Sequence, residues 1–484
     1  MRIDEYASYD ATGLAALVAR GDVSATELAQ LAGAAIAAVN PQVNAVVETY
    51  PERIATLDEA TLGAGPFRGV PFLMKDVYGH EAGRLIEFGS RLCRGLRVDT
   101  ETAYCQLVKA AGLNIIGRSA APEYSMAGTT EGALYGNTST PWRQGYSAGG
   151  SSGGAMAAVV AGMVPVAHGS DIGGSIRIPA SFCGGVGLKP SRGRISFAPN
   201  LDENGYGLAQ NFVQTKTLRD AAALLDCLCV PQPGDPFIIP RPAGRYADLA
   251  ATPAPRLRIG WSTAALMGID TDPQTAAAVA HTAHTLAAMG HEVEEYDLPF
   301  DGLAAMRAMM DVWFFGLDVR LAGYSKRSGI AISPHTLEPV IYAAYEHARS
   351  MSAAQFLPAM AAINVARRQL GAYFTRYDIW LSPTTARPAE SWGRYNLGRT
   401  DVPFEDIAPQ ILAPVCQFAL PHNIMGTPAL SLPLGQTRDG LPIGVQLAAG
   451  PANELLLLQL GSALEIALPW AQRVPPLHAS RARV

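Results

Sequence analysis

Two glycine-rich stretches decide the fold of this chain: Gly149-Gly150-Ser151-Ser152-Gly153-Gly154 and Ser170-Asp171-Ile172-Gly173-Gly174-Ser175-Ile176-Arg177. Glycine at this density loses much backbone entropy on folding, so it usually marks a loop with unusual backbone angles or a close approach to a ligand. Each stretch carries a serine of interest, Ser151 in one and Ser175 in the other. The glycine pair directly before Ser175 frees a run of backbone N–H groups that can point at an oxyanion.

A lysine upstream of both loops is a candidate base. Residues 69–74 read GVPFLM, an apolar run that predicts a buried strand, and Lys75 and Asp76 close it. Two serines and a lysine together can supply a nucleophile, a proton relay and a proton acceptor. Taken one at a time, these residues have ordinary structural interpretations: a lysine paired with Asp76, and two small side chains in tight turns.

The same residues resemble the amidase signature family of serine hydrolases. The triad of that family follows the order lysine, cis-serine, nucleophilic serine, and the resemblance assigns these roles to Lys75, Ser151 and Ser175. Further runs similar to the family are residues 121–123 (APE), 135–137 (YGN), 141–142 (PW), 183–190 (CGGVGLKP) and 426–433 (GTPALSLP). Residues 166–169 and 464–470 resemble most the branch that includes 6-aminohexanoate cyclic dimer hydrolase. The resemblance covers nearly the whole chain.

The resemblance implies a single α/β/α domain over residues 1–484, built on a mixed, twisted β-sheet with helices on both faces. Its core motifs span about 65–215, and a middle helical insertion, about 231–375, contributes to the substrate pocket. The alternation of strand, loop and helix patterns along the chain independently indicates an α/β architecture.

Capping signals locate the beginnings of several helices. Asp10 caps a helix, and residues 24–27 (SATE) form a capping box that begins the next one. We expect this second helix to reach about residue 39 and to be ended by Pro41 and Asn44. Another helix begins at Ser152 or Gly153, which places the Ser151 loop at a helix N-terminus, where negative charge is favoured.

The chemistry expected of the triad requires a neutral lysine. Ser175 attacks only if a base takes its proton, and we expect Ser151 to carry that proton to Lys75. A free lysine has a pKa of about 10.4, so burial must lower it by roughly 3 units, at a cost of about 4 kcal/mol. The oxyanion hole is expected from the backbone N–H groups of Ile172, Gly173, Gly174 and Ser175.

The remaining polar residues of the two loops are expected to support the triad. Asp171 and Arg177 are predicted to form a structural ion pair, and Ser152 to cap the following helix or to support Ser151. Residues 150–154 also fit the G-x-S-x-G elbow of α/β-hydrolases, which would make Ser152 the nucleophile of an esterase. His422 is the available triad histidine for that alternative, but it explains neither Lys75 nor the Ser175 loop.

The substrate pocket is predicted from the resemblance and from apolar residues. The resemblance places loop 124–128 at the acyl side of the site. The residues expected to bind substrate are Tyr124, Ser125, Met126, Gly128, Trp313, Ile424 and Met425. Whether Trp313 lines the pocket or belongs to the core stays open. Because loop 124–128 contains no charged residue, we expect an uncharged substrate: an aryl or alkyl amide, a nylon-type oligomer or a urethane (carbamate).

Composition excludes several other classes of function. The 484 residues are 49% hydrophobic and 16% charged, and the net charge is −5. No basic cluster suggests nucleic acid, and no apolar run is long enough to span a membrane. The N-terminus lacks the apolar segment of a signal peptide, so a cytoplasmic location is the default expectation. His281 and His284 lack a third ligand nearby, so we expect a solvated helix face there and no metal site. The predicted serine hydrolase needs no cofactor.

These observations together predict a cofactor-independent serine hydrolase that cleaves C–N bonds other than peptide bonds. Its partner is a small amide or carbamate molecule, and a homodimer is left open. One alternative is an amidotransferase component, which would supply ammonia to a partner protein holding aminoacyl-tRNA. Another is the esterase with Ser152 as nucleophile. A catalytically dead binding protein is disfavoured because all three triad residues are present.

Overall fold

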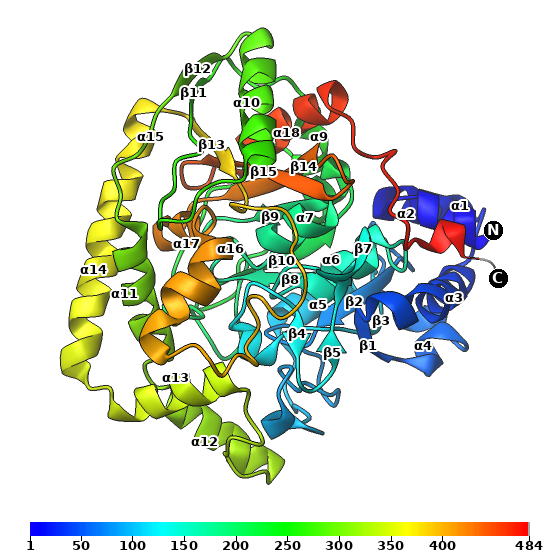
Figure 1. The fold of residues 1–484 in the computed structure, drawn as a ribbon. Helices are drawn as coiled ribbons and strands as arrows, with labels where there is room; N and C mark the ends of the chain where they lie inside the picture. The colour runs from blue at the N-terminus through cyan, green and yellow to red at the C-terminus, as the bar shows by residue number, and fades with distance from the viewer. Residues whose placement is uncertain (483–484) are drawn as a thin grey trace.

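An 11-stranded mixed β-sheet forms the centre of the computed structural model, which describes residues 1–482 (Figure 1). Its strand order is β1-β3-β2-β8-β10-β9-β14-β15-β13-β11-β12. The strands of the sheet are β1 (Val46–Thr49), β2 (Pro71–Lys75), β3 (Asn114–Ser119), β8 (Val166–Asp171), β9 (Val186–Lys189), β10 (Gln210–Thr215), β11 (Arg258–Trp261), β12 (Glu292–Glu295), β13 (Ile379–Pro383), β14 (Ala429–Gln436) and β15 (Pro442–Ala449). Two short pairs stand apart from it, β4 (Glu131–Gly132) with β5 (Gly136–Asn137) and β6 (Ser139–Thr140) with β7 (Arg143–Ser147).

Helices flank this sheet on both faces (Figure 1). They are α1 (Ile3–Ser8), α2 (Ala11–Arg20), α3 (Ala25–Val43), α4 (Pro51–Ile54), α5 (Ala103–Ala110), α6 (Gly153–Val160), α7 (Arg177–Cys183), α8 (Leu218–Leu228), α9 (Tyr246–Leu249), α10 (Pro273–Ala288), α11 (Gly302–Phe314), α12 (Leu317–Ser328), α13 (Pro339–Ser350), α14 (Ala353–Gly371), α15 (Tyr373–Arg376), α16 (Ala413–Cys416), α17 (Leu420–Met425) and α18 (Glu454–Ala467). None of the helices in residues 1–482 combines the length and the apolar character needed to cross a membrane.

Strand direction changes across the sheet. At one side of the sheet, neighbouring strands are parallel in the order β3, β2, β8. In the middle, each neighbouring pair is antiparallel along the order β8, β10, β9, β14, β15, β13. At the other side, the strands are again parallel in the order β13, β11, β12. The parallel pair β2–β8 matters most for the site, because parallel strands end at the same edge of a sheet. Lys75 ends β2 and Asp171 ends β8, so the lysine and the second glycine-rich loop meet at that edge.

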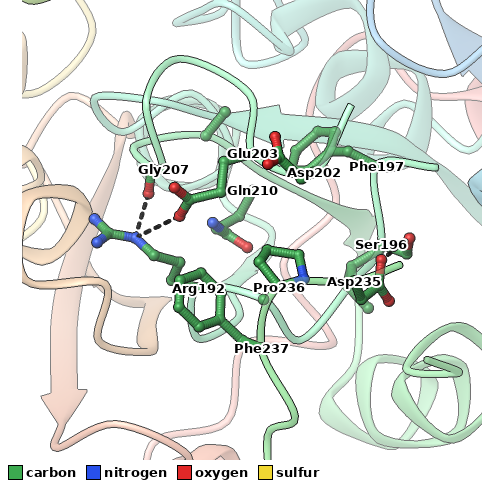
Figure 2. A pocket seen from close by; sticks show the side chains of 13 residues that line it. Arg192, Ser196, Phe197, Asp202, Glu203, Gly207, Gln210, Asp235, Pro236 and Phe237 are labelled. Atoms are coloured by element: carbon green, nitrogen blue, oxygen red, sulfur yellow. Dashed lines mark hydrogen bonds and ion pairs between the residues drawn. The ribbon is translucent and has the colours of Figure 1, made fainter. Parts of the chain in front are cut away.

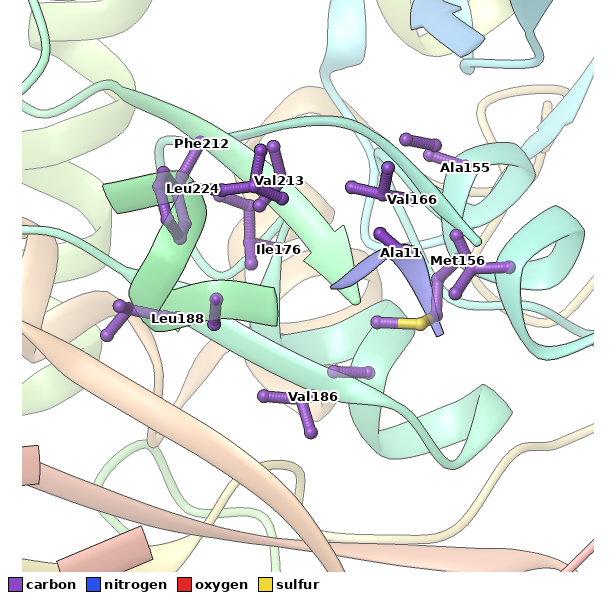
Figure 3. Close-up of a cluster of buried hydrophobic side chains, with 14 of the residues drawn as sticks. Ala11, Ala155, Met156, Val166, Ile176, Val186, Leu188, Phe212, Val213 and Leu224 are labelled. Atoms are coloured by element: carbon purple, nitrogen blue, oxygen red, sulfur yellow. The ribbon is translucent and has the colours of Figure 1, made fainter. Parts of the chain in front are cut away.

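The main hydrophobic core fills both faces of the sheet (Figure 3). Phe212 and Val213 are consecutive on β10, so their side chains point to opposite faces, and both are buried. Helix α8 contributes Leu224 to this core and α6 contributes Met156, which is fully buried. A strand buried on both faces needs a helix layer on each, and this confirms the α/β/α architecture expected from the sequence.

One helix boundary differs from the sequence expectation. Helix α3 begins after Ser24, whose hydroxyl accepts the N–H of Glu27 at 3.0 Å, as the capping box predicts. Pro41 does not end it: the helix continues to Val43 and ends at Asn44, the other residue expected to end it, in the left-handed conformation with φ 56°. The proline lies in the last turn, where its ring removes one hydrogen bond without stopping the chain, and Asn44 provides the actual C-cap.

The middle segment, residues 231–375, adds both strands and helices. β11 and β12 extend the sheet at one edge, and α11 packs against α14. A second hydrophobic cluster, separate from the main core, joins these helices to the loops that surround the two glycine-rich stretches. This cluster contains Trp313 and Tyr124, which the sequence places near the substrate.

We predict that Gly154→Ala destabilises the protein although alanine is the better helix former. A Cβ at position 154 would lie 2.5 Å from the Ala120 backbone nitrogen and 2.6 Å from its oxygen, so α6 would have to move away from the chain that follows β3. We expect a loss of about 3 kcal/mol from this overpacking, measured by denaturant unfolding. The matched control is Gly323→Ala in α12, where nothing lies within 4 Å of the new Cβ. There the free energy of unfolding should rise by up to about 1 kcal/mol; equal stabilities of the two variants would contradict the prediction.

Candidate active site

Lys75 lies at the end of β2 with its side chain fully buried. Its amine Nζ lies 2.7 Å from the Ser151 hydroxyl and 2.9 Å from the Ser170 hydroxyl. Both partners are neutral groups that come from the two glycine-rich stretches. The lysine and the first serine expected to act together are therefore in direct contact.

Burial lowers the pKa of Lys75 well below its ordinary value, and the negative charge of Asp171 opposes this effect only in part. Pairing with the neighbouring Asp76 does not occur. The Asp76 carboxylate instead forms an ion pair with Arg118 and accepts the N–H groups of Glu87 and Gly89, at 2.8 and 3.0 Å. Among residues 1–482, Lys75 has no carboxylate partner within salt-bridge distance, which favours the neutral amine.

The Ser151 loop is held by close backbone contacts. The peptide bond between Gly150 and Ser151 is cis. A Cβ at Gly150 would lie 2.3 Å from the Thr129 carbonyl oxygen, so only glycine fits there. The Thr130 hydroxyl donates to the Gly149 carbonyl at 2.8 Å. Glycines are needed here because this loop packs directly against another stretch of backbone.

Ser152 connects the two glycine-rich loops. Its fully buried hydroxyl donates to the Ser170 carbonyl and accepts the Ser170 N–H, both at 3.2 Å, and its own N–H donates to the Ser175 carbonyl at 3.2 Å. It makes no side-chain cap on α6, so the capping part of our expectation is wrong.

The elbow alternative, in which Ser152 attacks, is contradicted by the surroundings of the serine. Its hydroxyl is occupied by the Ser170 backbone, and no hydrogen bond joins it to a histidine in the described part of the chain. His422 is buried elsewhere, with Nδ1 3.3 Å from the Thr427 hydroxyl and its ring against Trp380.

Ser175 lies on the loop between β8 and α7, and 8% of its surface is exposed. Its hydroxyl has no hydrogen-bond partner within residues 1–482, in contrast to the hydroxyls of Ser151, Ser152 and Ser170. A serine hydroxyl that is partly exposed and free of hydrogen bonds can act as a nucleophile if a base takes its proton.

The predicted oxyanion hole needs one correction. The Gly174 N–H donates to the Asp171 carboxylate at 2.8 Å, so it is not a free donor. The Ile176 N–H binds the other oxygen of the same carboxylate at 3.1 Å. No partner is found within residues 1–482 for the N–H groups of Ile172, Gly173 and Ser175. These three remain available for an oxyanion.

A buried ion pair fixes the Ser175 loop from behind, as expected from the sequence. Arg177 and Asp171 are both fully buried and make two parallel contacts, Nε–Oδ2 at 3.0 Å and Nη2–Oδ1 at 2.9 Å. The other arginine donors bind the Ala419 carbonyl, the Gln446 side chain and the Asn423 side chain, at 2.8, 2.8 and 2.7 Å. Every charge is therefore compensated, which a buried pair requires.

A cavity of about 400 Å³ reaches the Ser175 loop at Ile172. Its lining is Tyr78, His80, Phe88, Thr102, Tyr124, Met126, Ile172, Phe197, Pro199, Asn200, Leu201, Glu203, Asn204, Gly205, Tyr206, Trp313, Leu317, Arg320 and Tyr324. One wall is aromatic: the rings of Tyr124 and Tyr324 are stacked at 5.8 Å, and Phe88 lies 4.8 Å from Tyr324. A volume of this size holds a small molecule.

A second, narrow pocket adjoins the cavity and shares Phe197 and Glu203 with it (Figure 2). Arg192 points toward Glu203 and Gly207 there: its Nε donates to the Gly207 carbonyl and lies 3.8 Å from a Glu203 carboxylate oxygen. These contacts hold residues 197–207 in place, and that segment forms one wall of the cavity.

The predicted substrate residues divide into two groups. Tyr124, Met126 and Trp313 line the cavity. The other four do not: Ser125, Gly128, Ile424 and Met425 belong to the packing around it.

The positions of two of these residues, Gly128 and Ile424, illustrate the difference. Gly128 packs against Val415, where a Cβ would lie 2.3 Å from the valine side chain. Ile424 is fully buried in helix α17, and its carbonyl accepts a hydrogen bond from Arg367 at 2.9 Å.

Sequence reasoning missed the other wall of the cavity. Segment 197–206 is rich in turn residues, but nothing in its pattern indicates that it faces the site. Two charged residues, Arg320 and Glu203, also line the cavity although loop 124–128 is uncharged. Within residues 1–482, no group of three or more His, Cys, Asp or Glu side chains is arranged to hold a metal ion.

Comparison with known proteins agrees with this geometry. A family model described as Amidase matches residues 27–458. The chain belongs to the amidase signature family. This amidase is 37% identical, over 484 aligned residues, to the 6-aminohexanoate-cyclic-dimer hydrolase of Paenarthrobacter ureafaciens, with 97% of this chain and 96% of the relative covered. An acylamidase of Rhodococcus erythropolis is 30% identical over 483 residues, with 96% of each chain covered.

Solved structures confirm the fold of the amidase. A structure of 6-aminohexanoate cyclic dimer hydrolase complexed with substrate superimposes with a TM-score of 0.90 and 34% identity, covering 97% of this chain and 99% of that one. The protein is therefore an enzyme that hydrolyses amide C–N bonds, and its substrate is a small molecule.

Proposed function

We propose that this amidase cleaves the C–N bond of small uncharged amides or carbamates, with Ser175 as nucleophile and Ser151 and Lys75 as its proton relay. The observation that carries the proposal is the 2.7 Å contact between the Lys75 amine and the Ser151 hydroxyl at a fully buried position. An amine held there without a carboxylate partner is suited to accept a proton at neutral pH.

In the first half of the reaction, Ser175 Oγ attacks the carbonyl carbon of the substrate. Its proton passes to Ser151 Oγ, whose own proton passes to the neutral Lys75 Nζ. The carbonyl oxygen becomes an oxyanion and accepts hydrogen bonds from the free N–H groups of Ile172, Gly173 and Ser175. When the tetrahedral intermediate collapses, the C–N bond breaks and the leaving nitrogen takes a proton from Ser151, which Lys75 replenishes. An acyl- or carbamoyl-enzyme on Ser175 remains.

In the second half, water attacks the acyl carbon and gives its proton through Ser151 to Lys75. Collapse of the second tetrahedral intermediate breaks the bond to Ser175 Oγ, and the same proton returns to that oxygen. The acid leaves, and the enzyme is restored with a neutral lysine. No cofactor is needed in either half, because every proton moves between groups of this chain, the substrate and water.

The cavity supports the proposed substrate class. Its aromatic wall of Phe88, Tyr124 and Tyr324 suits an aryl or alkyl group, and burying apolar surface there gains about 25 cal/mol per Å². The relative named 6-aminohexanoate-cyclic-dimer hydrolase supports nylon-type amides as candidate substrates. The relative named acylamidase supports aryl or alkyl amides as a second candidate class. Urethanes are included because a carbamate presents the same C–N bond to Ser175.

We also propose a cytoplasmic enzyme. All six cysteines are free thiols, and disulfides are rare in a reducing compartment. A homodimer stays a prediction, which light scattering of the purified protein measures directly.

The identity of the nucleophile is the first test. A fluorophosphonate probe should label Ser175, because its hydroxyl is free of hydrogen bonds and lies on the loop that reaches the cavity. Peptide mapping by mass spectrometry locates the label, and Ser175→Ala should remove it. A label on Ser152 would revive the esterase alternative and refute the proposed mechanism.

The role of the base predicts a pH profile. Because the neutral amine is the active form, kcat/KM should rise as the pH increases through the lowered pKa of Lys75 and level off above it. The apparent pKa of this limb should lie well below the value of about 10.4 for free lysine. Lys75→Ala should lose activity by about 10²- to 10⁴-fold with the fold retained, as circular dichroism would show. Normal turnover by this variant at neutral pH would exclude the relay.

The cavity predicts a preference for neutral substrates. Purified enzyme should turn over neutral anilides, alkyl amides or carbamates better than charged amino-acid amides of similar size. Trp313→Ala should raise KM without abolishing kcat, because Trp313 lines the cavity. The matched control is Phe314→Leu, since Phe314 is buried beside Trp313 but does not line the cavity; it should lower stability and leave KM unchanged.

Two outcomes of this panel would contradict the proposal. Faster turnover of charged amides would exclude the uncharged substrate class. Inactivity on every small amide, with ammonia release only in the presence of a partner protein, would favour the amidotransferase alternative.

A further inference from the structure

His168 lies on β8 beside the end of β2, and no step of the proposed mechanism uses it. The side chain is fully buried. Its Nδ1 accepts a hydrogen bond from the backbone N–H of Lys75 at 3.3 Å, and its Nε2 lies 3.4 Å from Oδ1 of Asn211 on β10. The imidazole ring packs on Tyr104, with 4.5 Å between ring centroids. One side chain therefore links three strands at the position of the base.

The hydrogen bond from Lys75 to His168 lies directly beyond the last backbone pairing between β2 and β8. β2 and β8 pair through Phe72 with Val166 and through Leu73 with Ala167. Beyond these pairs, the N–H of Lys75 meets the His168 ring instead of a carbonyl. A buried N–H needs an acceptor, so this bond determines how far β2 runs toward the loops and where the lysine side chain begins.

The hydrogen bonds define the state of the ring. A nitrogen that accepts a hydrogen bond carries no proton, so the neutral ring carries its proton on Nε2 and donates it to Asn211. Burial lowers the pKa of His168 to about 3, and the nearby Lys75 amine acts in the same direction. The ring is also held in place by Gly79, where a Cβ would lie 2.8 Å from Nδ1. His168 therefore stays neutral at the pH of catalysis and does not carry protons.

We propose that His168 is a positioning residue for the base: the neutral imidazole holds the Lys75 backbone so that Nζ reaches Ser151 and Ser170. The inference rests on the proposed role of Lys75 in proton transfer. It assigns a task to a histidine that has neither the contacts nor the protonation of a general acid or base. A displacement of Nζ by about 1 Å would be expected to lower turnover about 10²-fold, because proton relays depend on close contact.

The test compares two substitutions in the full-length enzyme. His168→Phe keeps the ring volume and the packing on Tyr104 but removes the acceptor for Lys75. His168→Asn keeps an acceptor near the position of Nδ1. We expect His168→Phe to lower kcat about 10²-fold with KM changed less than about twofold, and to move the acidic limb of the pH profile upward as Lys75 leaves its buried position. The kcat of His168→Asn should be at least tenfold higher than that of His168→Phe.

A second pair of variants covers the case in which His168→Phe does not fold. Asn211→Leu removes the acceptor of Nε2 while keeping the volume, so the ring can take the other tautomer and lose its bond to Lys75. The kcat of Asn211→Leu should fall at least threefold, and the acidic limb of its pH profile should move to higher pH, as expected for His168→Phe. The matched control is Tyr104→Phe, which keeps the ring against His168 but loses the hydrogen bond from its hydroxyl to the Phe212 carbonyl, at 2.7 Å. Its kcat and pH profile should match the native enzyme.

The outcomes separate this inference from the proposed function. If Lys75→Ala keeps normal turnover, the proposed relay fails and the inference fails with it. If Lys75→Ala is inactive but folded variants of His168 and Asn211 keep native kcat and an unmoved pH limb, the inference alone is overturned. Loss of thermal stability with unchanged kinetics of the folded enzyme would show a purely structural histidine. Equal loss of kcat in His168→Asn and His168→Phe would also refute the positioning role.

Discussion

The desolvation of the Lys75 amine is the constraint on which the catalytic region depends. An ammonium ion at a fully buried position would need a carboxylate or water to replace its hydration, and the protein surrounds it with the hydroxyls of Ser151 and Ser170 instead. Neutral partners favour the neutral amine. The amine of Lys75 and the hydroxyls of Ser151 and Ser170 form a small group of polar atoms that is held together away from water. Three features hold it: the parallel ends of β2 and β8, the close packing of the Ser151 loop and the buried hydrogen bonds of Ser152.

The ion pair of Asp171 with Arg177, which is buried beside this group, has its charges fully compensated. Asp171 receives Arg177 through two contacts and also accepts the backbone N–H groups of Gly174 and Ile176. Asp171 therefore shapes the Ser175 loop by occupying the N–H groups of Gly174 and Ile176 and leaving those of Ile172, Gly173 and Ser175 free. Asn423 and Gln446 complete the pairing from α17 and β15, far away in sequence. Removing Asp171 or Arg177 would leave a buried charge uncompensated, which is far more costly than losing a surface pair.

The sequence predicts the sheet, most helix boundaries and the contact between Lys75 and Ser151, because each rests on a residue type that few others can replace. Dense glycine marks backbone that must approach backbone, and a capping serine marks a helix start. The cavity wall could not be predicted: Tyr324 and segment 197–206 reach it through long-range packing that leaves no local pattern. Ile424 was misplaced because an aliphatic side chain suits a pocket and a core equally. The loss of the Gly174 donor depends on the direction of one carboxylate, which sequence does not record.

The substrate cavity draws its walls from parts of the chain that lie outside the central strands. Its outer wall comes from α11, α12 and segment 197–206, whereas Lys75 and Ser175 belong to strand ends of the sheet and the loop that follows β8. Substitutions in the outer wall therefore need not disturb the contact between Lys75 and Ser151. The shape of this cavity and the environment of the buried amine can therefore change separately, because different parts of the chain form them.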